Sequence, residues 1–324
     1  MPDILTLAGT NLLSPIILSF ILGLCAALAR SDLSVPEAAA KAVSLYLLFA
    51  IGFKGGASVA SHGIDGKLIA SVGAGLILSF GLPFVAFALL RLMTRLSRID
   101  AAAVAAHYGS ISIVTFVAAS SVLESRLIPA EGYMVAVAAA MEAPAILSAL
   151  WLVARGGNST REPGLWREIL LNGSIVLLIG AFAIGMVTGE KGLADISSFI
   201  VSPFKGVLCL FLLDMGLVAG RGLREQRGGL GFGAIAFAVV MPLIGSMAGL
   251  ALGLLVGLST GGVAMMMVLA ASASYIAVPA AMRVALPQAN PSIYLTLSLG
   301  VTFPFNLTLG IPIYIAIATA VTGA

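Results

Sequence analysis

Apolar stretches of about twenty residues, separated by short polar turns, follow one another along almost the whole chain. A helix of that length crosses the hydrocarbon core of a bilayer. The expected spans are 12–30, 36–53, 68–92, 101–122, 130–154, 168–188, 198–219, 231–257, 262–284 and 292–321. The pattern predicts an all-α polytopic membrane protein with about ten transmembrane helices.

The composition indicates lipid rather than water as the solvent. Of the 324 residues, 60% are hydrophobic and only 10% are charged, and the mean hydropathy is +1.11. A soluble domain carries about a quarter charged residues, so it could not bury this much apolar surface. The net charge of +3 is too small to indicate nucleic-acid binding.

Motifs for catalysis and metal binding are missing from the sequence. It contains no Walker loop, no His-Glu metal helix and no nucleophile elbow. Cys25 and Cys209 lie inside apolar runs, and His62 and His107 have no Cys/His cluster to complete a metal site. We therefore expect no enzyme activity, no cofactor and no transition metal.

Basic residues set the expected orientation in the membrane. With the N-terminus outside, most arginines, including Arg91, Arg95 and Arg98, fall in loops on the inner side. The basic residues counted on the outer side are Lys54, Lys67, Arg126 and Lys191, whereas Lys41 and Lys205 lie too near helix interiors to be counted. Because cytoplasmic loops are enriched in Lys and Arg, we expect a multi-pass protein of the bacterial inner (plasma) membrane with both termini outside.

The two halves of the chain resemble each other. "LYLLFAIGFKGG" (45–56) resembles "CLFLLDMGLVAG" (209–220), and "GSISIVTFVAASSV" (109–122) resembles "ASASYIAVPAAMRV" (271–284). Five spans per half is an odd number, so the second half must cross with opposite polarity, as in inverted-repeat transporters. We expect a first five-helix repeat at 1–155, a cytoplasmic linker at 156–167 and a second, inverted repeat at 168–324.

Polar segments at matching positions interrupt the fourth and ninth spans. Their residues are Gly109, Ser110, Ser112 and Thr115 in the fourth span, and Ser272, Ser274 and Pro279 in the ninth. Pro279 has no N–H to bond back to the Tyr275 carbonyl, so we expect a broken helix there. Two half-helix N-termini could then face one anion, with hydroxyls and carbonyls beside it for a small cation. The alternative is that Ser and Ala only allow close helix packing.

Polar residues within other spans are further candidates. A carboxylate at mid-bilayer costs about 2.5–3.5 kcal/mol on insertion scales, so Glu142 and Asp214 are candidates for function. Glu142 suits a cation or proton site, whereas Asp214 suits an ion pair, protonated burial or substrate contact. Thr302 and Asn306 in the last span either help hold a coupling ion or form interhelical hydrogen bonds.

Four segments together resemble a known family. They are "HYGSISIVTFVAASSVLE", "MEAPAILSALWLVA", "FLLDMGLVAGRGLRE" and "LAASASYIAVPAAMRVALPQANPSIY". They resemble the sodium-dependent bicarbonate transporter family first described in cyanobacteria, and the resemblance covers nearly the whole chain. It implies two inverted repeats forming core and gate bundles, and bicarbonate and sodium bound between broken helices 4 and 9. It also implies a homotrimer and a PII-like regulatory protein docking on the cytoplasmic side.

The family's site residues carry over in part. Gly109, Ser112 and Thr115 fall on its Gly-x-x-Ser-x-x-Thr segment, and Ser272 and Ser274 fall on its ninth-span serines. The departures are Ile113 and Val114 in place of small residues, Glu142 in place of Asp, and Tyr275 in place of a second Asp. These departures remove one carboxylate and make the expected site drier.

We expect a secondary active transporter of a small anion, with sodium-coupled bicarbonate symport by alternating access as the leading hypothesis. The expected substrate ligands are Gly109, Ser110, Ser112, Thr115, Ser272, Ser274 and Tyr275. The expected ligands of the coupling ion, Na+, are Glu142, Ser112, Ser274, Thr302 and Asn306. One alternative is a sodium- or proton-coupled carrier of a short carboxylate, which a phenol beside apolar side chains would suit. A non-transporting membrane scaffold or receptor is the alternative from a different class.

Overall fold

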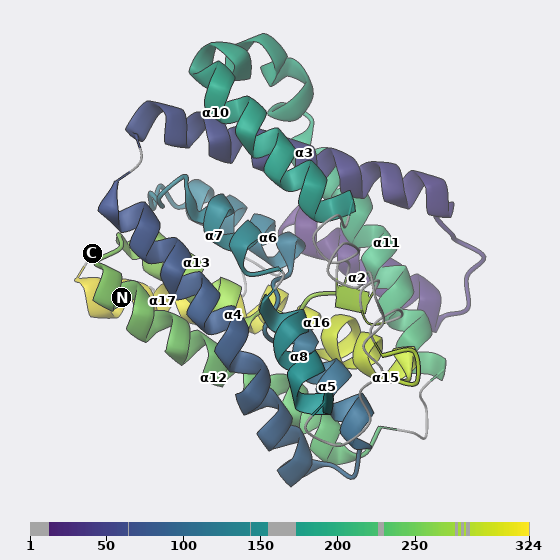
Figure 1. Ribbon diagram of the computed structural model, residues 1–324. Coiled ribbons are helices and arrows are strands. Elements are labelled where there is room, and N and C mark those ends of the chain that lie inside the picture. Colours follow the sequence, from purple (N-terminus) through teal and green to yellow (C-terminus); the bar gives the residue numbers. More distant parts are fainter. Residues whose placement is uncertain are drawn as a thin grey trace.

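The computed structural model describes residues 13–63, 65–142, 144–154, 173–225, 230–275, 278–279, 282 and 286–323 (Figure 1). Most of these residues are helical, and no strand occurs among them. The predicted all-helical class is therefore confirmed for the described chain. The expected linker at 156–167 lies outside the described residues.

Seven helical stretches in the described chain are long and apolar enough to cross a membrane. They are Glu37–Ser61, Gly66–Met93, Met134–Val153, Val176–Ile200, Phe204–Arg224, Phe232–Val256 and Pro291–Thr322. The three other expected spans coincide with shorter apolar helices, namely Pro15–Leu28, Ile113–Ser125 and Thr260–Ala271. This pattern is typical of a polytopic membrane protein. The total of ten transmembrane spans stays a prediction.

Six of the described helices each account for one expected span by themselves. They are α2 (Pro15–Leu28), α3 (Glu37–His62), α4 (Gly66–Met93), α10 (Gly173–Ile200), α11 (Phe204–Glu225) and α12 (Phe232–Val256). Ser14 caps α2 by accepting the Ile17 N–H at 3.4 Å, and Pro15 follows at the position where a missing N–H costs nothing. The Asp65 carboxylate caps α4 in the same way, accepting the Leu68 N–H at 2.8 Å.

A kink at Gly189 divides α10. This residue has φ 60° and ψ −152°, a conformation that glycine adopts with little strain. The expected sixth span ended at residue 188, and Glu190 and Lys191 just beyond the kink are exposed. Figure 1 shows the last part of α10 folding back at the top of the molecule.

Helices from the two halves of the chain pack in reciprocal pairs. α3 runs along α10, and α2 runs along α11 (Figure 1). A Cβ atom on Gly23 would lie 2.0 Å from the Leu213 carbonyl oxygen, and one on Gly56 would lie 1.9 Å from that of Phe182. These glycines let the paired backbones touch, as small residues do at many membrane-helix interfaces. The first helix described in each half thus meets the second helix of the other half.

The remaining elements, together with α4 and α12, form a second group. They are α5 (Arg98–His107), α6 (Ile113–Ser125), α7 (Met134–Ala140), α8 (Pro144–Ala154), α13 (Thr260–Ala271), α15 (Pro291–Leu295), η1 (Thr296–Thr302), α16 (Phe303–Phe305), η2 (Asn306–Gly310) and α17 (Ile311–Thr322). α4 packs against α5 and α8, and α12 packs against α13 and η1. The last span is continuous but widens twice to π-helical geometry, at η1 and η2. Such widening is often found at functional sites.

Two carboxylates tie this second group together near the starts of α5 and α13. Asp100, in the first turn of α5, accepts the N–H of Asn290 at 2.8 Å. Glu131, before α7, accepts the N–H of Ser259 at 2.7 Å and its hydroxyl at 2.9 Å. Each bond joins the start of one interrupted helix to the loop that precedes the last span of the other half.

Candidate functional site

The first interruption lies between α5 and α6. α5 ends at His107 and α6 begins at Ile113, so residues 108–112 leave helical geometry where the sequence predicts a break. The Ser112 hydroxyl caps α6, accepting the Thr115 N–H at 3.2 Å and the Thr115 hydroxyl at 2.9 Å. A serine at this position satisfies a first-turn N–H that has no partner within the helix.

The second interruption follows α13. α13 ends at Ala271 and residues 272–275 are not helical, whereas Val278 and Pro279 are helical again. The break was expected, but the attribution to Pro279 was wrong, because the helix stops well before the proline. Proline is well tolerated in a first helical turn, where its missing N–H is not needed.

The two interruptions, residues 108–112 and 272–275, meet in what we call the crossing. The Ser112 N–H donates to the Ser272 hydroxyl at 3.0 Å, and the Ser274 N–H donates to the His107 carbonyl at 2.8 Å. The Ser272 hydroxyl donates in turn to the Leu269 carbonyl at 2.9 Å. Backbone groups freed by one break are therefore partly satisfied by the other, as the absence of water in a membrane requires.

The crossing is closed to the surroundings in this structure. Of its predicted ligands, Ser110, Ser112, Thr115, Ser272, Ser274 and Tyr275 are all no more than 7% exposed. The structure therefore brings the seven predicted substrate ligands, these six and Gly109, into one buried region, and their roles stay predictions.

The close contact between residue 109 and α4 leaves room only for a glycine at this position. A Cβ atom at this position would lie 2.3 Å from Pro83 Cγ and 2.6 Å from the carbonyl oxygen of Ser79. The absence of a side chain thus lets the first interruption lie directly against α4. Sequence reasoning found Gly109 but not its partners, although a proline inside an apolar span is a visible signal.

Glu142 joins the crossing through Ser110. The Ser110 hydroxyl donates to Glu142 Oε2 at 2.9 Å, and the carboxylate is only 8% exposed. Glu142 lies between α7 and α8, where the Ser79 hydroxyl donates to the Met141 carbonyl at 2.6 Å. Glu142 forms no ion pair with another described residue. Its carboxylate therefore accepts a hydroxyl hydrogen bond but has no basic partner there.

Aromatic rings cover one side of the crossing. The Tyr275 ring meets the Phe303 ring edge to face at 5.2 Å between centroids, and Phe303 meets Phe20 of α2 at the same distance. The buried Tyr275 hydroxyl lies near the Ser112 side chain but makes no hydrogen bond of good geometry within the described chain. Tyr275 therefore offers an unused donor at the crossing.

Two polar residues of the last span make contacts here, Thr302 with the crossing and Asn306 with the end of α13. The Thr302 hydroxyl bonds to the Tyr108 hydroxyl at 2.7 Å and donates to the Ala238 carbonyl at 2.6 Å. Asn306 Nδ2 donates at 2.8 Å to the carbonyl of Ala271, the last residue of α13. Both residues therefore form the interhelical hydrogen bonds that were the alternative to ion binding. Their role as ligands of a coupling ion stays a prediction.

Asp214 is the remaining intramembrane carboxylate that the sequence singled out. It is on α11, is 8% exposed, and makes no hydrogen bond or ion pair within the described chain. The sequence did not indicate Tyr108 and Ser79 as candidate site residues. Their hydrogen bonds, to Thr302 and to the Met141 carbonyl, depend on how separate helices pack.

A comparison with curated proteins gives no match. A family model described as the Na+-dependent bicarbonate transporter superfamily matches residues 15–319, which is most of the chain. Together with the apolar helices, this match indicates a multi-pass membrane transporter rather than an enzyme. The chain belongs to the Na+-dependent bicarbonate transporter superfamily.

Proposed function

We propose that this protein is a secondary active transporter of a small anion and that the crossing holds the solute. The observation that carries the proposal is the pair of facing interruptions joined by the Ser112–Ser272 and His107–Ser274 hydrogen bonds. Irregular backbone inside a membrane is tolerated only where protein or a cavity satisfies it, and in transporters it forms the binding site. Within the family, sodium-coupled bicarbonate symport is the reaction that we propose.

The anion binds at the start of α6 in this proposal. Ser112 caps the Thr115 N–H, and the N–H groups of Ile113 and Val114 make no hydrogen bond within the described chain. These N–H groups and the positive end of the helix dipole favour an anion. The Tyr275 hydroxyl, which lacks a well-formed bond, supplies a further donor.

The coupling ion, Na+, binds near Glu142 in the same proposal. α5 and α13 both end at the crossing, so their last carbonyl groups bring partial negative charge to it. Carbonyls at such helix ends coordinate coupling cations in other transporters. Ser110 already holds Glu142 beside this region, and Ser112, Ser274, Thr302 and Asn306 stay candidate ligands.

Alternating access requires two bodies that move relative to each other. We propose that the α2/α11 and α3/α10 pairs form one body and that the group holding the crossing forms the other. The reciprocal pairing of the two halves supports an inverted repeat. The same proposal places the protein in a bacterial inner membrane with both termini outside.

A short carboxylate is the second candidate solute. The side chains of Ile113 and Val114 are 6% and 1% exposed at the head of α6, where the family has small residues. An apolar surface beside N–H donors suits a carboxylate with a methyl or ethyl tail better than it suits bicarbonate.

Uptake into vesicles separates these possibilities. Purified protein is reconstituted and given labelled bicarbonate or labelled acetate, with a sodium, potassium or pH gradient. Bicarbonate uptake that needs inward sodium supports the main proposal, and acetate uptake indifferent to sodium supports the second candidate. Uptake of neither solute above that of a Ser274→Leu variant with equal membrane expression would count against transport through the crossing.

A further inference from the structure

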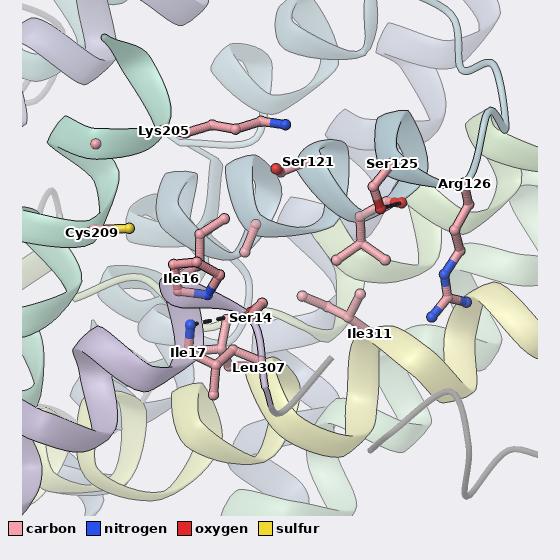
Figure 2. Close-up of a pocket in the computed structure, with 14 residues that line it drawn as sticks. Ser14, Ile16, Ile17, Ser121, Ser125, Arg126, Lys205, Cys209, Leu307 and Ile311 are labelled. Atoms are coloured by element: carbon pink, nitrogen blue, oxygen red, sulfur yellow. Dashed lines mark hydrogen bonds between the residues drawn. The ribbon is translucent and has the colours of Figure 1, made fainter. Parts of the chain in front are cut away.

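A cavity of about 620 Å³ lies next to the crossing (Figure 2). One wall is formed by the first turns of α2 and α11, and the other by the end of α6 with η2 and α17. Ala118 in this wall is three residues after Thr115, about 4.5 Å along the helix axis. Leu307 in the same wall directly follows Asn306. The cavity therefore reaches to within about one helical turn of the candidate site.

Two cationic side chains line this cavity. Lys205 reaches in from α11 and Arg126 from the end of α6, with Ser121 and Ser125 also in the lining (Figure 2). None of the described lining residues is acidic. Neither cation makes a side-chain hydrogen bond or an ion pair with another described residue. A cavity walled by low-dielectric protein with unpaired positive charge attracts anions.

The nearby carboxylate does not neutralise this charge. Glu124 lies two residues before Arg126 on α6, but its carboxylate is 3.8 Å from the amine of Lys54 on α3 and is not part of the lining. We refer to the space lined by Arg126 and Lys205 as the basic cavity.

The rings of Phe20 and Phe303 link the basic cavity to Tyr275 of the crossing. Phe20 is one turn along α2 from the cavity residue Ile17, and Phe303 is one turn along the last span from Leu307. The Phe303 ring packs edge to face against both Phe20 and Tyr275. Phe20 belongs to one of the two proposed moving bodies and Phe303 to the other, so relative motion would part these rings.

We infer that the basic cavity is an antechamber that concentrates a small monovalent anion at the predicted outer face before it passes the aromatic rings. The ends of α2, α6 and α11 that line it all lie on the side where the sequence places the outside. Delivery of the anion to the crossing rests on the proposed transport function, whereas the attraction of anions into the cavity does not. Arg126 and Lys205 act as positioning residues through their field.

A native thiol reports on the charge of the cavity without any transport. Cys209 lines the cavity, and Cys25 is the only other cysteine of the chain. In a Cys25→Ser background, the rate of Cys209 modification is measured by mass spectrometry with two thiosulfonate reagents, one carrying a sulfonate and one a trimethylammonium group. We expect the sulfonate-to-ammonium rate ratio to exceed that of a free thiol. It should fall about 3- to 10-fold in an R126Q/K205Q variant and decrease with added salt.

The matched control is Lys191→Gln, which removes an exposed positive charge on the same predicted face but outside the cavity. It should leave the ratio unchanged. A parent ratio equal to that of a free thiol, an equal fall in the control, or no reaction with either reagent would overturn the inference.

Uptake kinetics test delivery separately. In R126Q/K205Q vesicles we expect the KM for labelled bicarbonate to rise about 3- to 10-fold at low salt, with kcat nearly unchanged. An unchanged KM in an active protein would overturn the antechamber role. If no solute is carried but the thiol ratio behaves as expected, the proposed function fails while the anion-attracting cavity stands.

Discussion

The backbone N–H of Ser112 donates to the hydroxyl of Ser272 across 3.0 Å, joining two chain segments 160 residues apart. The acceptor is a side chain, so one substitution can remove it without changing the backbone. In the neighbouring bond, from the Ser274 N–H to the His107 carbonyl, both groups belong to the backbone, so a side-chain substitution does not remove either of them. Ser272 is therefore the position at which the crossing is most directly tested.

Replacing Ser272 with Ala should leave the buried Ser112 N–H without an acceptor. An unsatisfied buried donor costs about 1–3 kcal/mol, so we expect a lower unfolding temperature and reduced uptake. Ser246→Ala is the control, because this equally buried hydroxyl donates only to Leu243 in its own helix. Equal thermal shifts in the two variants, measured on purified protein, would contradict a special role for the Ser112–Ser272 bond.

Gly109→Ala should prevent the first interruption from lying against α4. The added methyl group would clash with Pro83 and with the Ser79 carbonyl, neither of which can rotate away. Overpacking of this kind costs about 1–3 kcal/mol or more. Gly81→Ala on the same helix α4 is the control, since a Cβ there has no neighbour within 4 Å. Size-exclusion profiles after heating measure the difference, and equal survival would argue against the clash.

Glu142→Gln should weaken sodium coupling while preserving the local structure. The amide oxygen of Gln can still accept the Ser110 hydroxyl, now 2.9 Å from the carboxylate, but the negative charge is lost. We expect the sodium concentration for half-maximal uptake to rise about tenfold, which corresponds to about 1.4 kcal/mol. Uptake measured over a range of sodium concentrations tests this, and an unaltered sodium dependence would exclude Glu142 as an ion ligand.

Tyr275→Phe should reduce uptake without reducing stability. The variant keeps the ring that packs on Phe303 and removes only a buried hydroxyl that lacks a well-formed bond. If that hydroxyl donates to the solute, the KM should rise about tenfold. Tyr314→Phe is the contrasting control, because it breaks a bond to Asn306 Oδ1 at 2.9 Å and should lower the unfolding temperature. A Tyr275→Phe protein with normal KM would remove this donor from the proposed site.

The sequence predicted the helical class and the positions of the breaks, because both depend on local patterns. Apolar stretches indicate spans, and the Gly-Ser segment at 109–112 marks the first break. The cause of the second break was misjudged. Helix α13 ends at Ala271, where Ser272 bonds to the other interruption, and Pro279 lies in the helical turn beyond the break.

Contacts between distant helices were not predictable from one sequence. The partnership of Ser110 with Glu142, the fit of Gly109 against Pro83 and the rings linking Phe20 to Tyr275 all depend on how helices pack. Widening of the last span at η1 and η2 carries no local composition signal that we identified. Asp214 was named for its charge alone, and it makes no hydrogen bond or ion pair with another described residue.

The reciprocal packing of α2 with α11 and of α3 with α10 bears on how the polypeptide is assembled during synthesis. When the ribosome has completed α3, the helices that cover it and α2 have not yet been translated. Lipid tails can solvate α2 and α3 until their partners are made. The backbone contacts at Gly23 and Gly56 cannot form until the second half has been inserted. Insertion must therefore precede pairing, and two fragments divided at the linker would have to share one membrane to build either pair.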